Sequence, residues 1–296
     1  MFEEFKNAFQ KPNNAHVQLI VINVAVFLAM ALIYVFSKIL GVETAFKIIH
    51  DQFSIPPQFW IFITRPWTIL TYAFAHSLSD IFHILFNMLA LYWFGKLFIE
   101  YLGSDKLIGI YVLGALAAGF IYLVVFNTIP FFKEQANFDG MVGASGAIYA
   151  IMVATATLLP NYTFMLLFFG PVKIKYIVGF YIVLSFLGSV GSNSGGNIAH
   201  LGGALMGFIY TKQLQAGVNW GGWITAIIDW TKNIFQPKPK VKVTYRKEET
   251  QAKKSSSSST KGSQDEIDSI LDKISDKGYE SLSKDEKEKL FNASKK

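Results

Sequence analysis

A serine and a histidine far apart in the chain have the residue types and settings that nucleophilic catalysis requires. Ser145 lies in a run of small residues, Gly143-Ala144-Ser145-Gly146, at the start of a long apolar segment. His200 opens another apolar segment, and a neutral imidazole near pH 7 is suited to take the proton of a serine hydroxyl. No Asp or Glu is placed in the sequence to orient His200, so the pattern predicts a Ser-His dyad instead of a triad.

Two further polar residues offer hydrogen-bond donors for the same chemistry. His83 and Asn87 are four residues apart in an apolar segment, so they share one face of a helix. Together with the free backbone N–H groups that a helix N-terminus supplies at Ser145 and its neighbours, they would form an oxyanion hole. Ser145 and Asn87 also have plainer interpretations. A buried Ser usually bonds its own helix backbone, and an Asn commonly joins two helices by a hydrogen bond.

Glycines near these residues suit close helix packing. Gly203 and Gly207 follow His200 as a G-x-x-x-G pattern, which lets another helix backbone approach closely. If the partner is the helix of residues 143–159, where Gly143, Gly146 and Ala150 are also small, His200 and Ser145 come within hydrogen-bond reach. The glycines would then support the chemistry structurally.

The segments that carry these residues are typical of a chain that crosses a membrane several times. Hydrophobic residues make up 52% of the 296 residues and charged residues only 16%, with a mean hydropathy of +0.34. Six apolar segments have about the length of a span across roughly 30 Å of hydrocarbon. They are residues 17–40, 81–102, 107–126, 143–159, 174–190 and 198–214. The sequence predicts an all-α polytopic membrane protein built as a six-helix bundle.

On this six-helix arrangement the polar residues fall at one depth. His83 and Asn87 lie in the first two turns of the second helix, Ser145 in the first turn of the fourth, and His200 in the first turn of the sixth. All three helices would run inward from the outer side. Polar groups in hydrocarbon are costly unless they face the bundle interior or an aqueous cavity, so their shared depth predicts a functional site.

The rest of the chain divides by composition. Residues 1–16 predict a cytoplasmic N-terminal segment, 17–215 the membrane domain, 216–236 an interfacial amphipathic helix, 237–264 a flexible linker and 265–292 a cytoplasmic helical hairpin. The loop at 41–66 is aromatic and is expected to lie at the membrane interface.

In the predicted C-terminal hairpin, Gly278 interrupts a helical pattern, and Ser283 with Glu286 predicts a capping box. A module that binds a cytoplasmic partner and a marginally ordered tail are equally compatible with this composition.

Charge and cysteine content bound the partners and the chemistry. The distribution of Lys and Arg favours both termini in the cytoplasm, and we expect a bacterial inner membrane with the site open to the outer side. The net charge of +6 lies mostly in the C-terminal tail and does not require nucleic acid. The chain has no cysteine, which excludes disulfides, thiol catalysis and Cys-ligated metal, and we expect no cofactor and no metal.

These motifs, taken together, resemble those of the rhomboid family of intramembrane serine proteases over about residues 15–215. The resemblance rests on the order of three motifs and on Pro66-Trp67 and Leu70-Thr71 upstream of them. The three motifs are G-x-S-G at Gly143 to Gly146 with Tyr149 one turn later, H-x-x-x-N at His83 and Asn87, and A-H-x-x-G-x-x-x-G at Ala199, His200, Gly203 and Gly207. Two structural positions depart from the family pattern. Thr68 follows Trp67 where the family often has Arg. The family's G-x-x-x-E-x-x-x-G motif falls between Gly95 and Gly103, and Glu100 is displaced by one position within it.

The resemblance implies hydrolysis of a peptide bond in or beside a transmembrane helix of a protein substrate, single-pass or polytopic, within the lipid bilayer. Ser145 would be the nucleophile, His200 the base, and His83 and Asn87 with backbone N–H groups the oxyanion hole, while Tyr149 would pack beside His200. A mobile wall made by helix five and the loop at 191–197 would admit the substrate.

Three other functions compete with this interpretation. A non-catalytic relative that binds transmembrane clients would be expected to lack the Ser or the His, and both are present. A channel or small transporter would predict broken helices or internal repeats. A metal site on His83 and His200 lacks further ligands at matching depth.

Overall fold

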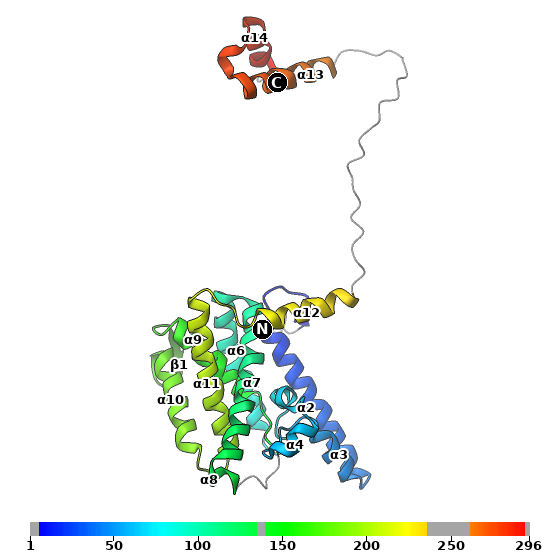
Figure 1. Cartoon of the computed structure of the whole chain (residues 1–296), viewed down its shortest axis with the longest axis vertical. Coiled ribbons are helices and arrows are strands. Elements are labelled where there is room, and N and C mark those ends of the chain that lie inside the picture. The colour runs from blue at the N-terminus through cyan, green and yellow to red at the C-terminus, as the bar shows by residue number, and fades with distance from the viewer. Residues whose placement is uncertain (1–5, 135–139, 236–260, 294–296) are drawn as a thin grey trace. The chain divides into compact units, whose positions relative to one another are not determined.

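The computed structural model describes residues 6–134, 140–235 and 261–293 and divides the chain into two compact units, Met1–Lys238 and Pro239–Lys296. Most of the described residues are helical. The first unit contains one helix for each of the six predicted segments (Figure 1). These are α2 (Ala15–Ile39), α6 (Ile81–Leu102), α7 (Ser104–Thr128), α9 (Ser145–Leu158), α10 (Ile174–Gly188) and α11 (Ser194–Gln215).

Three of the described helices, α2, α6 and α7, are long and apolar enough to cross a membrane. Helices α9 and α10 are shorter apolar helices of 14 and 15 residues. At 1.5 Å per residue, α9 is about 21 Å long, which is less than the thickness of the hydrocarbon core. Helix α9 packs against α6, α7, α10 and α11, so four of the other five helices surround it.

Two helix boundaries correct the sequence-based prediction. Helix α9 begins at Ser145 and not at Gly143, because Gly143 adopts a φ of +140° that no helix accommodates. Helix α11 begins at Ser194, four residues before the predicted start, so His200 lies in its second turn and the prediction of the first turn is wrong. The predicted mobile loop at 191–197 is correspondingly shorter, since its last four residues are helical.

Shorter elements fill the connections. They are α3 (Glu43–His50), α4 (Phe59–Thr64), α5 (Thr68–Thr71), η1 (Tyr72–Phe74) and α8 (Pro130–Lys133). Helix α12 (Gly222–Phe235) corresponds to the predicted interfacial helix and lies across one end of the upright helices (Figure 1).

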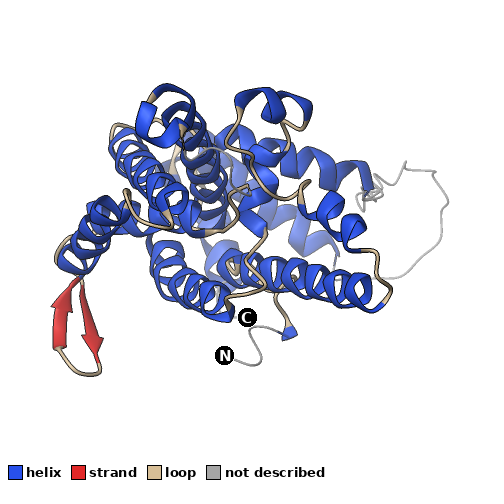
Figure 2. Cartoon of the chain, turned by 90° about the horizontal axis from the view of Figure 1, so that it is seen from below, coloured by secondary structure: helices blue, strands red, loops and turns tan. Residues whose placement is uncertain are grey.

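A β-hairpin between α9 and α10 was not predicted and is an exception to the all-α fold. Strand β1 (Thr163–Leu166) pairs antiparallel with β2 (Gly170–Lys173), and the hairpin projects from the edge of the bundle (Figure 2). Gly170 has a φ of +67°, which glycine adopts at little cost in a tight turn. The turn residues Leu167 to Phe169 are at least 80% exposed. No Asn-Gly or Asp-Gly pair marks this turn, so the usual sequence signal of a hairpin is missing.

The second unit is the helical hairpin expected at 265–292, with α13 (Lys261–Lys277), η2 (Tyr279–Ser281) and α14 (Lys284–Ala293). The capping box is confirmed, because the Ser283 N–H donates to Glu286 Oε2 at 2.7 Å and the Glu286 N–H donates to Ser283 Oγ at 3.3 Å. Lys273 on α13 binds both carboxylate oxygens of Glu286 and lowers its pKa to about 2. The predicted linker at 237–264 lies almost entirely outside the described residues.

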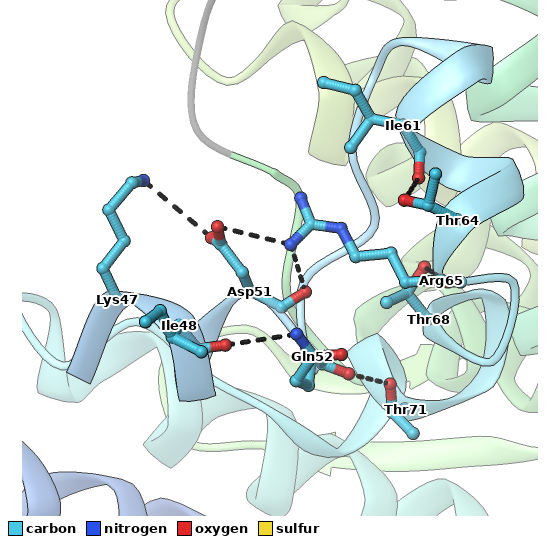
Figure 3. A network of polar contacts seen from close by, with 9 residues as sticks. All are labelled: Lys47, Ile48, Asp51, Gln52, Ile61, Thr64, Arg65, Thr68 and Thr71. Carbon is cyan, nitrogen blue, oxygen red and sulfur yellow. Dashed lines mark hydrogen bonds and ion pairs between the residues drawn. The ribbon is translucent and has the colours of Figure 1, made fainter. Parts of the chain in front are cut away.

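A polar network orders the loop between α2 and α6 (Figure 3). Arg65 Nη1 donates to the Asp51 carbonyl at 2.8 Å and lies 3.3 Å from Asp51 Oδ2. Thr71 Oγ1 donates to the Gln52 carbonyl at 2.8 Å. The network therefore fixes the end of α3 against α5. Of the two cations drawn in Figure 3, Arg65 is mostly buried and Lys47 is mostly exposed.

We expect Arg65→Ala to lower the free energy of unfolding by about 1–2 kcal/mol, because it removes a charge-assisted hydrogen bond and an ion pair that is only partly exposed. Unfolding of the purified protein in detergent measures this, and limited proteolysis should show faster cleavage within residues 41–66. Lys47→Ala is the matched control, since Lys47 is largely exposed and lies 3.9 Å from the same carboxylate. Equal effects of the two substitutions would contradict the role given to Arg65.

Candidate active site

The structure brings Ser145 and His200 into direct contact although they are 55 residues apart. His200 Nε2 lies 2.7 Å from Ser145 Oγ, a hydrogen-bond distance. Ser145 is the first residue of α9, and His200 projects from α11. This is the arrangement of a hydroxyl nucleophile and a neighbouring base.

Glycines on α11 set the distance between these two side chains. A Cβ atom built on Gly203 would overlap the carbonyl oxygen of Gly146, and one on Gly207 would overlap the carbonyl oxygen of Ala150. The expected contact between the G-x-x-x-G face and the helix that starts with Ser145 is thus present. Backbone rests on backbone here, so any side chain at either glycine would push the two helices apart.

Tyr149 and Ala144 complete the surroundings of the pair. The Tyr149 ring stacks on the His200 imidazole, with 4.2 Å between ring centroids and 8° between ring planes. Ala144 precedes Ser145, is fully buried and accepts a backbone hydrogen bond from Ile148. The imidazole is therefore held on one face by an aromatic ring.

His83 and Asn87 line the same cavity as Ser145 and His200. A Cβ atom on Gly143 would come within 2.9 Å of His83 Nε2, so Gly143 allows His83 to approach the backbone before Ser145. Asn87 is buried, and its Nδ2 has no hydrogen-bond partner among the described residues. The amide of Asn87 thus has donor capacity left for a ligand in the cavity.

The backbone that leads into Ser145 is held by the loop at 41–66 and by η1. Ile55 and Met141 exchange two backbone hydrogen bonds of 3.0 and 2.9 Å, and the Gly143 N–H donates to the Tyr72 carbonyl at 3.0 Å. The Tyr72 hydroxyl in turn donates to the Ala115 carbonyl at 2.8 Å. This loop therefore positions the start of α9 and has more than an anchoring role.

Two side chains next to the site were not singled out from the sequence. Ser185 on α10 lies 3.1 Å from His200 Nδ1, and the only signal for it is a hydroxyl within an apolar helix. His76 is buried with its ring 5.2 Å from that of His83, between centroids, and burial keeps its pKa below the ordinary range. His76 lies before α6, outside the six apolar segments of the sequence.

A cavity of about 1590 Å³ joins the polar residues to an apolar surface. Most of its lining residues are aromatic or aliphatic, and most of these apolar residues come from α6, α10 and the β-hairpin. Examples are Phe86, Trp93, Phe164, Phe169, Tyr176 and Phe180. Within the described residues, no three His, Asp or Glu side chains gather where they would hold a metal ion.

The fold and the site define the class of the protein, which is an apolar helical bundle with a serine hydroxyl and an imidazole in contact inside it. Comparison with known sequences specifies the family. A family model described as the rhomboid domain matches residues 64–216, more than half of the chain. The chain belongs to the rhomboid family and is a multi-pass membrane protein. A second model, described as a family of unknown function (DUF6576), matches residues 257–296.

Several named relatives align with parts of this chain. RHOMBOID-like protein 12, mitochondrial, from Arabidopsis thaliana is 33% identical over 192 residues, which are 60% of this chain and 56% of that protein. Rhomboid protein 1, mitochondrial, from Saccharomyces cerevisiae is 30% identical over 166 residues, 53% of this chain and 44% of the relative. Rhomboid protease GlpG from Salmonella newport is 31% identical over 129 residues, 43% of this chain and 40% of the relative. The chain thus spans about half the length of these relatives.

We expect Gly207→Ala to destabilise the protein by about 1–3 kcal/mol, because the added methyl group overlaps the Ala150 carbonyl in a packed helix contact. Gly179→Ala is the matched control, since a Cβ at Gly179 on α10 meets nothing within 4 Å and alanine favours the helix. Thermal unfolding in detergent compares the two. A Gly207→Ala protein as stable as Gly179→Ala would mean that the contact between α9 and α11 does not depend on glycine.

Proposed function

We propose that this chain is an intramembrane serine endopeptidase that cleaves transmembrane protein substrates in or near their membrane-spanning helix. The observation that carries the proposal is the 2.7 Å contact between His200 Nε2 and Ser145 Oγ at the start of α9. Membership of the rhomboid family and the resemblance to a relative named rhomboid protease support it. The apolar lining of the cavity suits a hydrophobic substrate segment.

The proposed reaction is acyl transfer followed by hydrolysis. Ser145 Oγ attacks the carbonyl carbon of the scissile peptide bond while His200 Nε2 takes the hydroxyl proton. The peptide C–N bond then breaks, and His200 gives the proton to the leaving amine. A water molecule, deprotonated by His200, then attacks the carbonyl carbon of the acyl-serine ester. The ester C–O bond breaks, His200 returns the proton to Ser145 Oγ, and the substrate leaves with a new carboxyl group.

The negative oxygen of the tetrahedral intermediate requires donors that are already in place. The first N–H groups of α9, those of Ser145 and Gly146, have no carbonyl partner within the helix and serve as backbone donors. The unpartnered amide of Asn87 and a ring N–H of His83 supply side-chain donors in the same cavity. The positive end of the α9 dipole adds to the stabilisation.

We further propose that α2, α6, α7, α9, α10 and α11 all span the membrane, with both termini in the cytoplasm and the site open to the opposite side. The Lys and Arg distribution supports this orientation. Under this proposal the helical hairpin at 261–293 is cytoplasmic and available to a partner there. The relatives named above include mitochondrial and Salmonella proteins, so the bacterial inner membrane stays a prediction.

The main alternative is a non-catalytic rhomboid protein that binds transmembrane clients. The same cavity would serve for binding, but binding alone requires neither a serine at a helix start nor an imidazole at 2.7 Å from it. The contact therefore favours the enzyme.

The proposal predicts that Ser145→Ala and His200→Ala each abolish cleavage of a transmembrane test substrate and labelling by a fluorophosphonate probe. Wild type and both variants would be purified in detergent. Cleavage and labelling would be compared between proteins whose thermal unfolding shows equal stability. Cleavage by Ser145→Ala at the wild-type rate would refute the mechanism. Wild-type protein that binds transmembrane segments without cleaving or labelling would favour the non-catalytic alternative.

We expect Asn87→Ala to lower kcat by about 10²-fold or more, as the loss of one oxyanion donor does, with little change in stability. Asn23→Ala is the control, because Asn23 on α2 donates to the Tyr111 hydroxyl at 3.1 Å, away from the cavity. The control should lose stability and keep its kcat. An unchanged kcat in folded Asn87→Ala would argue against the oxyanion role.

A further inference from the structure

We propose that Ser185 on α10 is a positioning residue for His200 and fixes the tautomer in which His200 acts as a base. This inference rests on the proposed function and adds a third side chain to the dyad. Ser185 occupies the place next to Nδ1 where a carboxylate stands in a Ser-His-Asp triad.

A continuous chain of hydrogen bonds starts at the nucleophile. Ser145 Oγ lies 2.7 Å from His200 Nε2, and His200 Nδ1 lies 3.1 Å from Ser185 Oγ. Ser185 Oγ donates to the Tyr149 hydroxyl at 2.9 Å. The Tyr149 hydroxyl donates to the Tyr181 carbonyl, at the longer distance of 3.4 Å.

The direction of this chain is set at its far end. A backbone carbonyl only accepts, so the Tyr149 hydroxyl gives its proton to Tyr181 and its oxygen accepts from Ser185. A serine hydroxyl has one proton, and once that proton is directed to Tyr149 the Ser185 oxygen is left as an acceptor for His200 Nδ1–H. The proton of the neutral imidazole then resides on Nδ1, and the lone pair of Nε2 faces Ser145.

The opposite tautomer would disable the site. With the proton on Nε2, His200 would donate to Ser145 Oγ and would have no lone pair to take the hydroxyl proton. Ser185 would then have to turn its own proton toward Nδ1 and give up the bond to Tyr149. The hydrogen bonds beyond His200 therefore favour the catalytically competent form.

A hydroxyl in this position has an advantage over a carboxylate in an apolar bundle. Ser185 is 2% exposed, and an ionised Asp or Glu there would carry a large desolvation cost. The neutral Ser185 oxygen accepts a hydrogen bond from Nδ1–H both before and after His200 becomes charged. Its stabilisation of the imidazolium is smaller than that from a carboxylate, but it requires no buried negative charge.

The residue comes from the least enclosed helix around the site. Of the 15 residues of α10, only Ile174, Val178 and Ser185 are buried. Tyr181 and Ser185 are four residues apart, so both ends of the bond chain to Tyr149 lie on one face of α10. An outward displacement of α10 would therefore separate Ser185 from His200, whereas the seam between α9 and α11 would keep His200 beside Ser145.

The kinetic test compares three substitutions in the full chain with a transmembrane test substrate. Ser185→Ala removes the acceptor, and we expect kcat to fall about tenfold with KM unchanged. Ser185→Thr keeps a hydroxyl and should stay within about threefold of wild type. Ser189→Ala is the control, because Ser189 on the same helical segment donates to the Phe186 carbonyl at 2.7 Å and should leave kcat unchanged.

A second measurement reads the tautomer without catalysis. Nitrogen-15 NMR of histidine-labelled protein, assigned by the signal that His200→Gln removes, should show the proton on Nδ1 in wild type. Ser185→Ala should shift His200 toward a mixture of tautomers, and Ser185→Thr should restore the wild-type signal.

The proposal is overturned if kcat and the nitrogen shifts are the same in wild type and Ser185→Ala. It is also overturned if Ser185→Ala and Ser185→Thr lose activity equally together with thermal stability, since that is the behaviour of a packing residue. Wild-type protein without any cleavage would defeat the proposed function, and the nitrogen shifts would still decide the tautomer.

Discussion

The contact of α9 with α11 determines whether the candidate site exists. Gly203 and Gly207 carry no side chain, so the α11 backbone lies directly on the carbonyl groups of Gly146 and Ala150. Ser145 immediately precedes Gly146, and His200 precedes Gly203 by less than one turn. In a bilayer, moving apolar surface from lipid to a helix contact releases little free energy. Close van der Waals packing of the backbones therefore drives helix association. The residues that stabilise the seam therefore also set the hydroxyl-to-imidazole distance.

A second constraint acts on the chain just before Ser145. The pairing of Ile55 with Met141 and the bond from the Gly143 N–H to Tyr72 hold an extended segment that ends in a residue with positive φ. That turn ends the segment and lets α9 begin at Ser145, with the first N–H groups of the helix next to the hydroxyl. The polar network around Arg65 lies in the same loop and fixes the α3 end of it (Figure 3). The loop and the seam together place Ser145 from both sides.

The length of apolar runs was enough to locate the helices, because a span has to satisfy its backbone internally and has a minimum length. The bounds of α6 were predicted to the residue, and the capping box at Ser283 was read from two side chains. The start of α11 was missed because Gly195 and Gly196 are typical of a loop. In the structure, a Cβ on Gly195 would come within 2.9 Å of the Tyr122 ring on α7, so the glycine serves tertiary packing inside a helix. Such a contact between distant segments is invisible in one sequence.

The candidate site was predictable for residues whose type is unusual in an apolar helix and for residues within a motif, such as Ser145 in its run of small residues. His83, Asn87 and His200 stand out there because polar side chains in hydrocarbon are costly. Ser185 does not stand out, since a lone serine on a helix normally bonds its own backbone, as Ser189 does at the end of α10. What distinguishes the two serines is the neighbour each one faces. Ser185 faces an imidazole and a tyrosine hydroxyl, so it makes both of its bonds to side chains of other helices.

The site thus combines parts with different mechanical support. Ser145 and His200 lie beside a seam where α9 and α11 touch through their backbones, at Gly203 against Gly146 and at Gly207 against Ala150. Ser185, the hydrogen-bond partner of His200 Nδ1, lies on α10, which buries only three of its residues. A substrate helix that entered the apolar cavity beside α6 and α10 would press on the second part and leave the first in place. Under the proposed mechanism, the contact between hydroxyl and imidazole is a property of the fold, whereas the tautomer in which the imidazole would act as a base depends on where α10 lies.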